Sequence, residues 1–468
     1  MLRLIAQKKN NLLILALFFV CALVTYPSSL SLVNEWMKWG QTLSHGFACL
    51  ALFVFFVWNQ VTVSESSASV SKSLILLLGI NSIFWCFSLL GNLQLPGYIF
   101  ALTNFWFYLA GIFGWSAARA FLPVCAIFLF ALPVWSILND LLIDISSYVV
   151  GFALSFLDLT LYLQDNQIMT PWGTIIIADG CSGLRYLTIS LLLAYLLCLI
   201  NCYHPKTAVI LFVVAALLGL VTNWIRIVII VLIGYYTELH HGLVRNHEFF
   251  GWILFSSILF PALYFSPQLK PKPNVAIVRI TFSWLLIIAG LLGPIIYFLT
   301  PFSQIKNPIN LSALESTFPS SEMNYYLPKP ELIINLPPAD KVATYISVQE
   351  VPIYIELMTR TPKQKNEKIV PYFGKIYDTF SWRVKDTINL HDSRINIIEN
   401  RLNQQKILLM YKYQVGSFTT YDYYQAKLLQ IPAKLMNQSY FGFWVAQASC
   451  ELTCEKEISA MKDLNLKW

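Results

Sequence analysis

Residues 206–236 read KTAVILFVVAALLGLVTNWIRIVIIVLIGYY, an apolar run in which Arg226 is the one charged residue after the initial lysine. A membrane-spanning helix needs about 20 mostly apolar residues, so this run is long enough to cross a bilayer. Backbone groups in lipid must bond within their own segment, and the run lacks the alternating pattern of a membrane barrel, so it is predicted to be helical.

Similar apolar stretches recur through the first part of the chain. In order they are 11–26, 42–58, 74–91, 98–117, 121–137, 141–163, 183–201, 206–236, 249–265 and 278–300. Of the 468 residues, 57% are hydrophobic and 12% are charged, whereas soluble domains carry roughly 25% charged residues. Residues 1–300 hold 22 charged side chains and residues 301–468 hold 35. This predicts an all-α polytopic membrane domain followed by a soluble domain. It excludes a disordered chain and a nucleic-acid-binding protein, because the net charge of +7 is spread without a basic run.

The loop lysines and arginines predict the topology. Because basic residues favour cytoplasmic loops, Arg3 places the N-terminus in the cytoplasm, and Lys270–Arg279 places the loop before the last stretch there too. The last stretch then carries residues 301–468 outside. With cytoplasmic Lys206, an odd number of crossings must precede residue 183, but six stretches do. The weakest of them, 141–163, is therefore predicted to be a re-entrant or interfacial helix on the outer side.

The charge-rich end of the chain has the pattern of a small α+β domain. The predicted elements are strands in 341–358, a strand and turn in 406–418, a helix in 421–438 and a last strand in 441–450. The predicted domains are 1–300, a 301–340 linker and 341–468. Cys450 and Cys454 could form a disulfide outside the cell, but their short spacing is tight for one, so both states stay open.

A polar turn precedes the helix predicted from residue 183. It consists of Asp179, Gly180, Cys181, Ser182 and Gly183, after an extended β-branched run. Ser182 or Asp179 is expected to cap the helix. Cys181 at a helix N-terminus, with Arg185 four residues on, has the setting that stabilises a nucleophilic thiolate. The alternative is an inert, buried cysteine.

Arg226 lies deep in an apolar run and must face protein or a water-filled cavity. Asn223 is three residues before it and shares its helix face. Arg226 could form a structural ion pair with Asp179 or Glu248, or it could bind a carboxylate or an oxyanion.

His247 precedes the ninth apolar stretch at the predicted outer interface, where its ordinary pKa suits acid–base work. A structural histidine is the alternative. His45 adds a polar group at the start of the second span. Under the predicted topology Cys181, Arg226 and His247 all lie at the outer face, which favours a thiol acyl-transfer enzyme. The sequence contains no HExxH, GxSxG or P-loop motif, and no metal or other cofactor is predicted.

Four motifs together resemble the exosortase/archaeosortase family. They are SHG at 44–46, CSGLR at 181–185, NWIRI at 223–227 and HEFFGW at 247–252. The resemblance covers about residues 10–265 of the printed sequence. Residues 301–468 are similar to the exosortase-associated periplasmic domain, a match that rests on YKYQVG and YYQAKLLQ.

The resemblance implies an integral-membrane cysteine protease or transpeptidase of the bacterial inner membrane. Such enzymes process exported proteins with a C-terminal sorting tail of the PEP-CTERM type, and the process is linked to exopolysaccharide production. By resemblance Cys181 is the nucleophile, Arg226 the transition-state stabiliser and His247 the acid/base. The residues expected to support these or bind substrate are Arg185, Asn223, Ser182, Gly183, Asp179, Glu248 and His45. Tyr186 and the Asp179–Gly180 pair depart from the family pattern. The expected partners are tailed proteins and membrane lipid; the acceptor, an amine or a lipid, is open.

Two other classes remain. An outer-leaflet polysaccharide polymerase or ligase also uses arginine and histidine, and a transporter or assembly factor for exopolysaccharide needs no chemistry. Neither requires Cys181, so the reactivity of that thiol distinguishes them from a thiol enzyme.

Overall fold

The structure is a computed structural model that forms two compact units. It describes residues 2–38, 41–60, 70–157, 159–164, 166–177, 179–201, 203–245, 248–264, 283–301, 332–336, 341–348, 351–365, 367–372, 376–378, 381–390, 393–401, 403–450 and 454–463. The helical unit contains residues 1–84 and 94–292, and the C-terminal unit contains residues 85–93 and 293–468.

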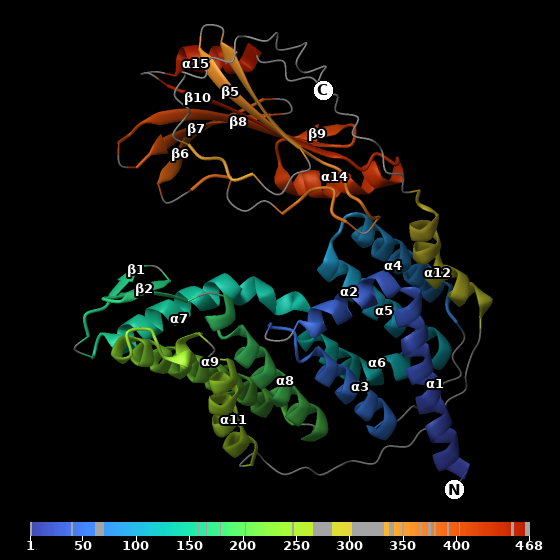
Figure 1. Ribbon diagram of the computed structural model, residues 1–468. Helices are drawn as coiled ribbons and strands as arrows, with labels where there is room; N and C mark the ends of the chain where they lie inside the picture. Colours follow the sequence, from blue (N-terminus) through green and yellow to red (C-terminus); the bar gives the residue numbers. More distant parts are fainter. Residues whose placement is uncertain are drawn as a thin grey trace. The chain divides into compact units, whose positions relative to one another are not determined.

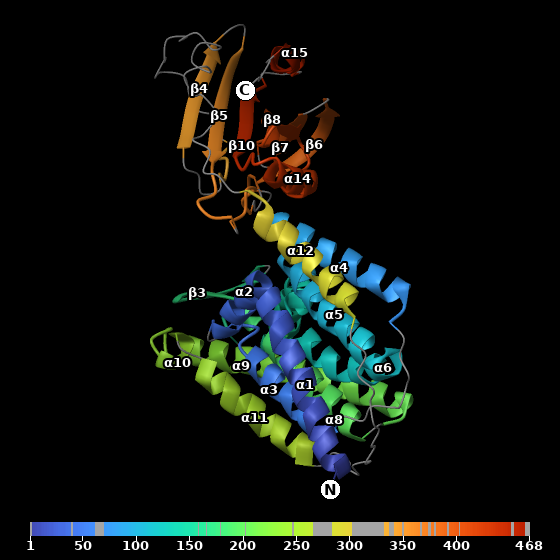
Figure 2. The ribbon, with the colours of Figure 1, turned by 90° about the vertical axis from the view of Figure 1, so that its right-hand side faces the viewer.

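The helical unit confirms the predicted class, because every predicted apolar stretch contains helix (Figures 1 and 2). Its α-helices are α1 (Leu2–Val24), α2 (Tyr26–Met37), α3 (Gly46–Gln60), α4 (Lys72–Leu90), α5 (Gln94–Phe113), α6 (Trp115–Cys125), α7 (Asn139–Leu154), α8 (Leu184–Asn201), α9 (Pro205–Tyr236), α10 (Gly242–Arg245), α11 (Glu248–Tyr264) and α12 (Trp284–Leu299). Three 3₁₀ helices join them: η1 (Ala126–Phe130), η2 (Pro133–Leu138) and η3 (Asp179–Cys181).

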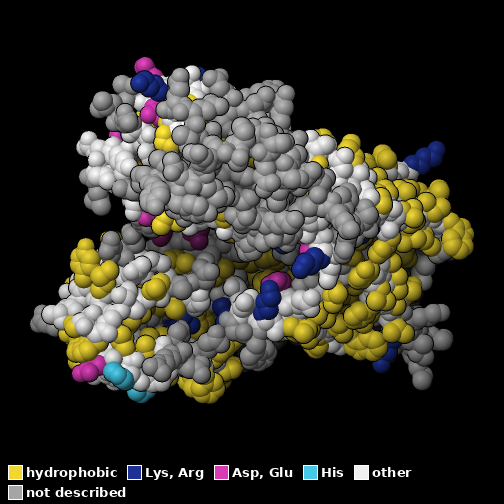
Figure 3. Space-filling model, turned by 45° about the horizontal axis from the view of Figure 1, so that its top comes forward, with side chains coloured by type: hydrophobic (Ala, Val, Ile, Leu, Met, Phe, Trp, Pro, Cys, Tyr) yellow, Lys and Arg dark blue, Asp and Glu magenta, His cyan; other side chains and the backbone are white. Residues whose placement is uncertain are grey.

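The helical surface suits a lipid environment. Within the described residues, five helices are long and apolar enough to cross a membrane, or six if α1 and α2 form one bent span. Figure 3 shows hydrophobic side chains covering much of the visible helical surface. Because a soluble protein rarely exposes such wide apolar area, this surface indicates contact with lipid.

Two features of the helical unit were not predicted. The chain bends by 97° between α1 and α2, where Pro27 stands in the first turn of α2. Residues 159–177 contain a three-stranded antiparallel sheet of β1 (Tyr162–Gln164), β2 (Gln167–Thr170) and β3 (Gly173–Ile176), in the order β1-β2-β3. The predicted stretch 141–163 is therefore helical only as far as Leu154.

Helix α7 lies beside the C-terminal part of α9. Trp224 Nε1 of α9 donates to Ser146 Oγ of α7 at 3.2 Å, and beyond α7 the hydroxyls of Thr160 and Tyr235 are 2.9 Å apart. The segment Pro133–Leu154 is also long and apolar enough to span a membrane. The interfacial placement of 141–163 thus stays a prediction.

The C-terminal unit contains the predicted α+β fold. Its strands are β4 (Lys341–Val348), β5 (Pro352–Arg360), β6 (Trp382–Asn389), β7 (Arg394–Asn400), β8 (Lys406–Val415), β9 (Phe418–Thr420) and β10 (Phe441–Ser449). They form one antiparallel sheet in the order β4-β5-β10-β8-β7-β6, with β9 beside β8. Two helices complete it, α14 (Tyr423–Leu435) and α15 (Glu455–Asp463).

Strand β10 is buried on both faces of this sheet. Phe443 packs in the cluster that contains Ala433 of α14, and Trp444 packs in the cluster that contains Met461 of α15. Leu332, within the predicted linker, is buried in the cluster on the α14 face. The sequence predicted β4, β5, β8, β10 and α14 but missed β6, β7 and α15.

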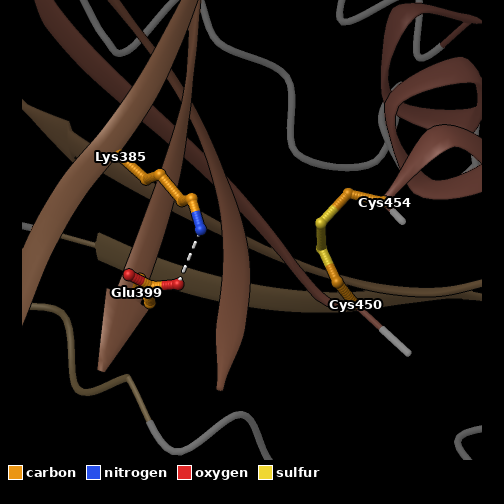
Figure 4. The surroundings of a disulfide bond; sticks show 4 residues. All are labelled: Lys385, Glu399, Cys450 and Cys454. Atoms are coloured by element: carbon orange, nitrogen blue, oxygen red, sulfur yellow. Dashed lines mark hydrogen bonds and ion pairs between the residues drawn. A yellow bond between two sulfur atoms is a disulfide. The ribbon is translucent and has the colours of Figure 1, made fainter. Parts of the chain in front are cut away.

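Cys450 and Cys454 form a disulfide, which the sequence left open (Figure 4). Their Cα atoms are 4.9 Å apart, within the normal range for a disulfide. The bond joins the residue after β10 to the residue before α15. Figure 4 also shows the ion pair of Lys385 with Glu399, in which Lys385 Nζ lies 2.9 Å from Glu399 Oε1.

The C-terminal ends of α4 and α12 belong to the C-terminal unit. Gln430 Nε2 donates to the Gly91 carbonyl at 3.1 Å, and Lys365 Nζ donates to the Thr300 carbonyl at 2.6 Å. Both carbonyls lie at helix ends, where backbone acceptors lack partners within the helix. The C-terminal ends of the two helices are therefore held by the same unit.

We expect the stability of the C-terminal unit to rise between pH 8 and 10.5. Burial, with a smaller effect from the Lys365 charge, lowers the pKa of Lys434 from 10.5 to about 8. Between these values the unfolded chain binds more protons than the folded one, so raising the pH favours folding. Lys434→Met should remove this rise in the free energy of unfolding, which is on the order of 2 kcal/mol. Pulse proteolysis of the full-length protein in urea provides the measurement. Lys462→Met, at an exposed position of α15, is the control and should keep the rise.

Candidate active site

Cys181 ends the 3₁₀ turn η3, between strand β3 and helix α8. Its side chain is half-buried. The sequence predicted an extended run, a polar turn and a helix in this order, and the structure has all three. The β-branched residues of 173–176 favour the strand, and the apolar residues after Leu184 favour a buried helix.

Gly183 makes the reversal between the cysteine turn and α8. Its φ is +86°, a region that side chains with a Cβ rarely adopt. A Cβ there would also stand 2.8 Å from Asn223 Nδ2. Backbone conformation and close approach to α9 therefore both require glycine.

Asn223 and Arg226 dock the cysteine turn onto α9. Asn223 Nδ2 donates to the Cys181 carbonyl at 2.7 Å, and Arg226 Nη2 donates to the Gly180 carbonyl at 3.0 Å. Both side chains are buried. Their three-residue spacing predicts that they share one helix face, and this face packs against the cysteine turn. The side chains of Asp179 and Glu248, the predicted alternative partners of Arg226, lie outside the described residues.

Tyr186 completes the surroundings of Arg226. Its hydroxyl accepts a hydrogen bond from Arg226 Nη1 at 2.8 Å, and the guanidinium carbon is 5.2 Å from the ring centroid. Sequence reasoning noted Tyr186 only as a departure from the family pattern. A tyrosine on a buried helix needs a partner for its hydroxyl, and that need was the available signal.

Helix α11 packs against the same pair of side chains. A Cβ on Gly251 would collide with Tyr186 Oη and stand 2.9 Å from Arg226 Cδ, so a larger residue here would force Tyr186 or Arg226 to move. Figure 2 shows α9 and α11 side by side. His247, four residues before Gly251, lies outside the described residues.

Helix α7 contributes Ser146 to the site, a residue that the sequence did not single out. Ser146 Oγ donates to the Ser182 carbonyl at 3.4 Å and accepts from Trp224 Nε1. Ser182 Oγ in turn accepts the backbone N–H of Leu184 at 3.4 Å, one of the unpaired donors at the start of α8. The cysteine turn is therefore held from α7, α8 and α9.

His45 and Arg185 lie in the packing beside this site. His45 Nε2 donates to the Phe130 carbonyl at 2.7 Å, and Trp36 Nε1 donates to the Ala131 carbonyl at 2.9 Å. Arg185, in the first turn of α8, is close enough to His45 for their charges to interact. These contacts tie the start of α3 to the end of η1.

A cavity of about 250 Å³ adjoins Cys181. Its lining is mostly aliphatic: Thr174, Ile175, Ile176, Ile177, Cys181, Ile227, Ile230, Val231, Leu239 and Val244. Cys181 thus lines this cavity, while the Gly180 carbonyl of the same turn accepts a hydrogen bond from Arg226.

The arrangement has the parts of an acyl-transfer site. The guanidinium keeps donors beyond its two hydrogen bonds; its Nε is buried and has no partner among the described residues. A buried cation with unused donors can stabilise a carboxylate or a developing oxyanion. Among the described residues, no cluster of histidine, cysteine and acidic side chains could hold a metal.

Comparison with protein families matches residues 36–264 to the transmembrane exosortase family. Residues 36–264 of this chain therefore form an exosortase segment. The match contains the cysteine turn, the Asn223–Arg226 face and α11, so the exosortase motifs coincide with the site described above. Comparison with curated proteins and with solved structures finds no match. The exosortase segment ends before residue 293, so the assignment of residues 301–468 to the exosortase-associated domain stays a prediction.

We expect Gly183→Ala to destabilise this exosortase and lower its activity. The substitution forces a side chain into a left-handed conformation and against Asn223, at a cost on the order of 1–3 kcal/mol. The thermal unfolding midpoint in detergent should fall. Gly180→Ala is the matched control in the same turn, because its added Cβ meets nothing within 4 Å. Equal midpoints for the two variants would contradict the requirement at Gly183.

Proposed function

We propose that this exosortase is a cysteine peptidase or transpeptidase that cleaves the C-terminal sorting tail, of the PEP-CTERM type, of exported proteins. The observation that carries the proposal is the cysteine turn, whose carbonyls are held by Asn223 and Arg226 beside an apolar cavity. An inert buried cysteine needs neither a buried arginine on its turn nor an adjoining cavity.

The proposed reaction begins with the Cys181 thiolate. Its sulfur attacks the scissile carbonyl carbon of the tail and forms a tetrahedral oxyanion, which Arg226 and backbone N–H groups near Gly183 stabilise. The carbon–nitrogen bond then breaks, and His247 gives a proton to the leaving amine. The product is a thioester on Cys181. Water or an acceptor amine attacks it, loses its proton to His247 and releases the thiolate.

The position of α11 supports the role of His247. Gly251 contacts Arg226 and Tyr186, and His247 is four residues earlier in the chain. Four residues span at most about 14 Å even when extended, so the proposed proton transfer requires His247 to stand within that reach of Gly251.

We further propose that the protein lies in the bacterial inner membrane with the C-terminal domain in the periplasm. Lys72 at the start of α4 and the basic residues before α12 favour the cytoplasmic side, so both helices would end on the outer side. The ends of both helices belong to one unit, which supports this placement. The disulfide of Cys450 with Cys454 suits an oxidising compartment. The exported domain is then placed to recruit the acceptor or the exported part of a substrate.

The test uses a tailed reporter, an exported soluble protein fused to a Pro-Glu-Pro motif, an apolar span and a basic end. Its intact mass is measured after co-expression with and without the enzyme. We expect loss of the tail only with the enzyme, and any added mass identifies the acceptor. An intact tail together with altered polysaccharide would contradict the proposal and favour a polymerase.

A further inference from the structure

Strand β3 is an edge strand beside the candidate nucleophile. The sheet order is β1-β2-β3, and among the described residues β3 pairs only with β2. An unpaired edge presents backbone N–H and C=O groups that can accept another extended chain. Most proteins cover or shorten such edges, whereas this one lies beside Cys181.

The pairing register shows which groups face the open edge. The Ile177 N–H donates to the Asn166 carbonyl at 2.8 Å, and Gly173 is paired with Thr170 across the hairpin turn. Because antiparallel strands turn alternate residues toward the partner, 173, 175 and 177 face β2. The N–H and C=O groups of Thr174 and Ile176 therefore point away from the sheet.

The cavity at Cys181 runs along this edge. Four consecutive residues, 174–177, line it, although neighbouring side chains of a strand point to opposite faces. Because these residues alternate between the two faces of the strand, a cavity that touches all four also reaches the backbone of β3. Its other walls come from α9 and from Leu239 and Val244, and Cys181 completes the lining.

We propose that an extended segment of the substrate pairs with the open edge of β3 as a fourth strand. Its scissile carbonyl then lies at Cys181, and a small or aliphatic side chain beside that bond enters the cavity. This inference rests on the proposed function and names how its substrate is held.

The physical argument concerns the backbone of the tail. A peptide bond can be attacked only where the chain is extended and accessible, and an extended chain that leaves water for an apolar site loses hydrogen-bond partners. The edge groups of Thr174 and Ile176 supply partners that depend little on side chains. The cavity determines which substrate side chain is preferred beside the scissile bond, because its mostly aliphatic lining excludes charged side chains.

Proline substitutions test the edge, since proline removes an N–H while an edge strand tolerates its ring. Thr174→Pro and Ile176→Pro should each lower kcat/KM for the tailed reporter about tenfold, mainly through KM, because each removes a backbone hydrogen bond. Thr174 and Ile176 are exposed, so little packing is lost.

The matched control lies on the opposite edge of the same sheet. Tyr162 pairs with Met169 and Gln164 with Gln167, so the intervening Leu163 turns its N–H to the far edge. Leu163→Pro should change kcat/KM by less than about twofold. Equal losses in all three variants would show a general effect on the sheet and overturn the inference.

If a proline variant fails to fold, cross-linking tests the pairing of the substrate with β3 instead. In a Cys181→Ala background, Ile176→Cys is paired with single cysteines moved along the tail of the reporter. We expect disulfides at alternate tail positions, the period of a strand. Cross-links without periodicity, or none, overturn the inference. The wild-type enzyme assayed in parallel separates the two proposals: tail cleavage without edge cross-links refutes only the edge.

Discussion

Cys181→Ala is expected to abolish tail cleavage, lowering kcat for the tailed reporter by at least about 10³-fold. The proposed thioester cannot form without the sulfur. The methyl group of alanine fits the half-buried position, so the fold should be kept. The remaining rate would come from binding and oxyanion stabilisation alone.

The control for this variant is Cys198→Ala. Cys198 is also half-buried and lies in α8, the helix that follows the cysteine turn. We expect the control to cleave at the wild-type rate. Intact masses of the reporter at several times provide the measurement, and cleavage by the Cys181→Ala enzyme at a rate close to wild type would refute thiol catalysis.

Arg226→Lys should lower kcat about 100-fold while the positive charge is kept. The planar guanidinium reaches the Gly180 carbonyl and the Tyr186 hydroxyl together. A lysine ammonium is a point charge that cannot reproduce this fork geometry. We expect the substitution to displace the cysteine turn and to weaken the stabilisation of the oxyanion.

Thiol labelling separates these two contributions of Arg226. If the arginine mainly positions the turn, the rate of Cys181 alkylation should change along with kcat. If it mainly stabilises the oxyanion, kcat should fall while alkylation is unchanged. Arg119→Lys, at an exposed position of α6, is the control. An unaltered kcat in Arg226→Lys would exclude both roles.

Much of the fold was predictable from the chain because it depends on local hydrophobicity. A run such as 206–236 needs only its own apolar side chains to become helical in a membrane, and α9 covers Pro205–Tyr236. The alternating pattern of 341–358 likewise predicts β4 and β5. Strands β6 and β7 escaped prediction because their interspersed polar residues hide the pattern, although side chains such as Ile395 and Ile398 are buried.

The candidate site was predictable in its chemistry but not in its geometry. Cys181 was found from the polar turn that contains it. Arg226 was found because a charged side chain within an apolar run costs free energy in a membrane. Tyr186 and Gly251 gave little signal, because each matters only through its contact with Arg226. The open edge of β3 had no signal of its own, since an edge is defined by which strands are absent beside it.

The sequence by itself thus determined the membrane-spanning helices, the soluble α+β domain and the residues that carry the proposed chemistry. Each of these follows from the free energy of placing a residue in lipid or water, which neighbours along the chain decide. Only the tertiary structure decided that α9 holds the carbonyls of the cysteine turn and that β3 leaves an edge open along the cavity. Those features depend on where helices and strands distant in sequence meet, because hydrogen bonds and close packing act over a few ångströms between specific atoms.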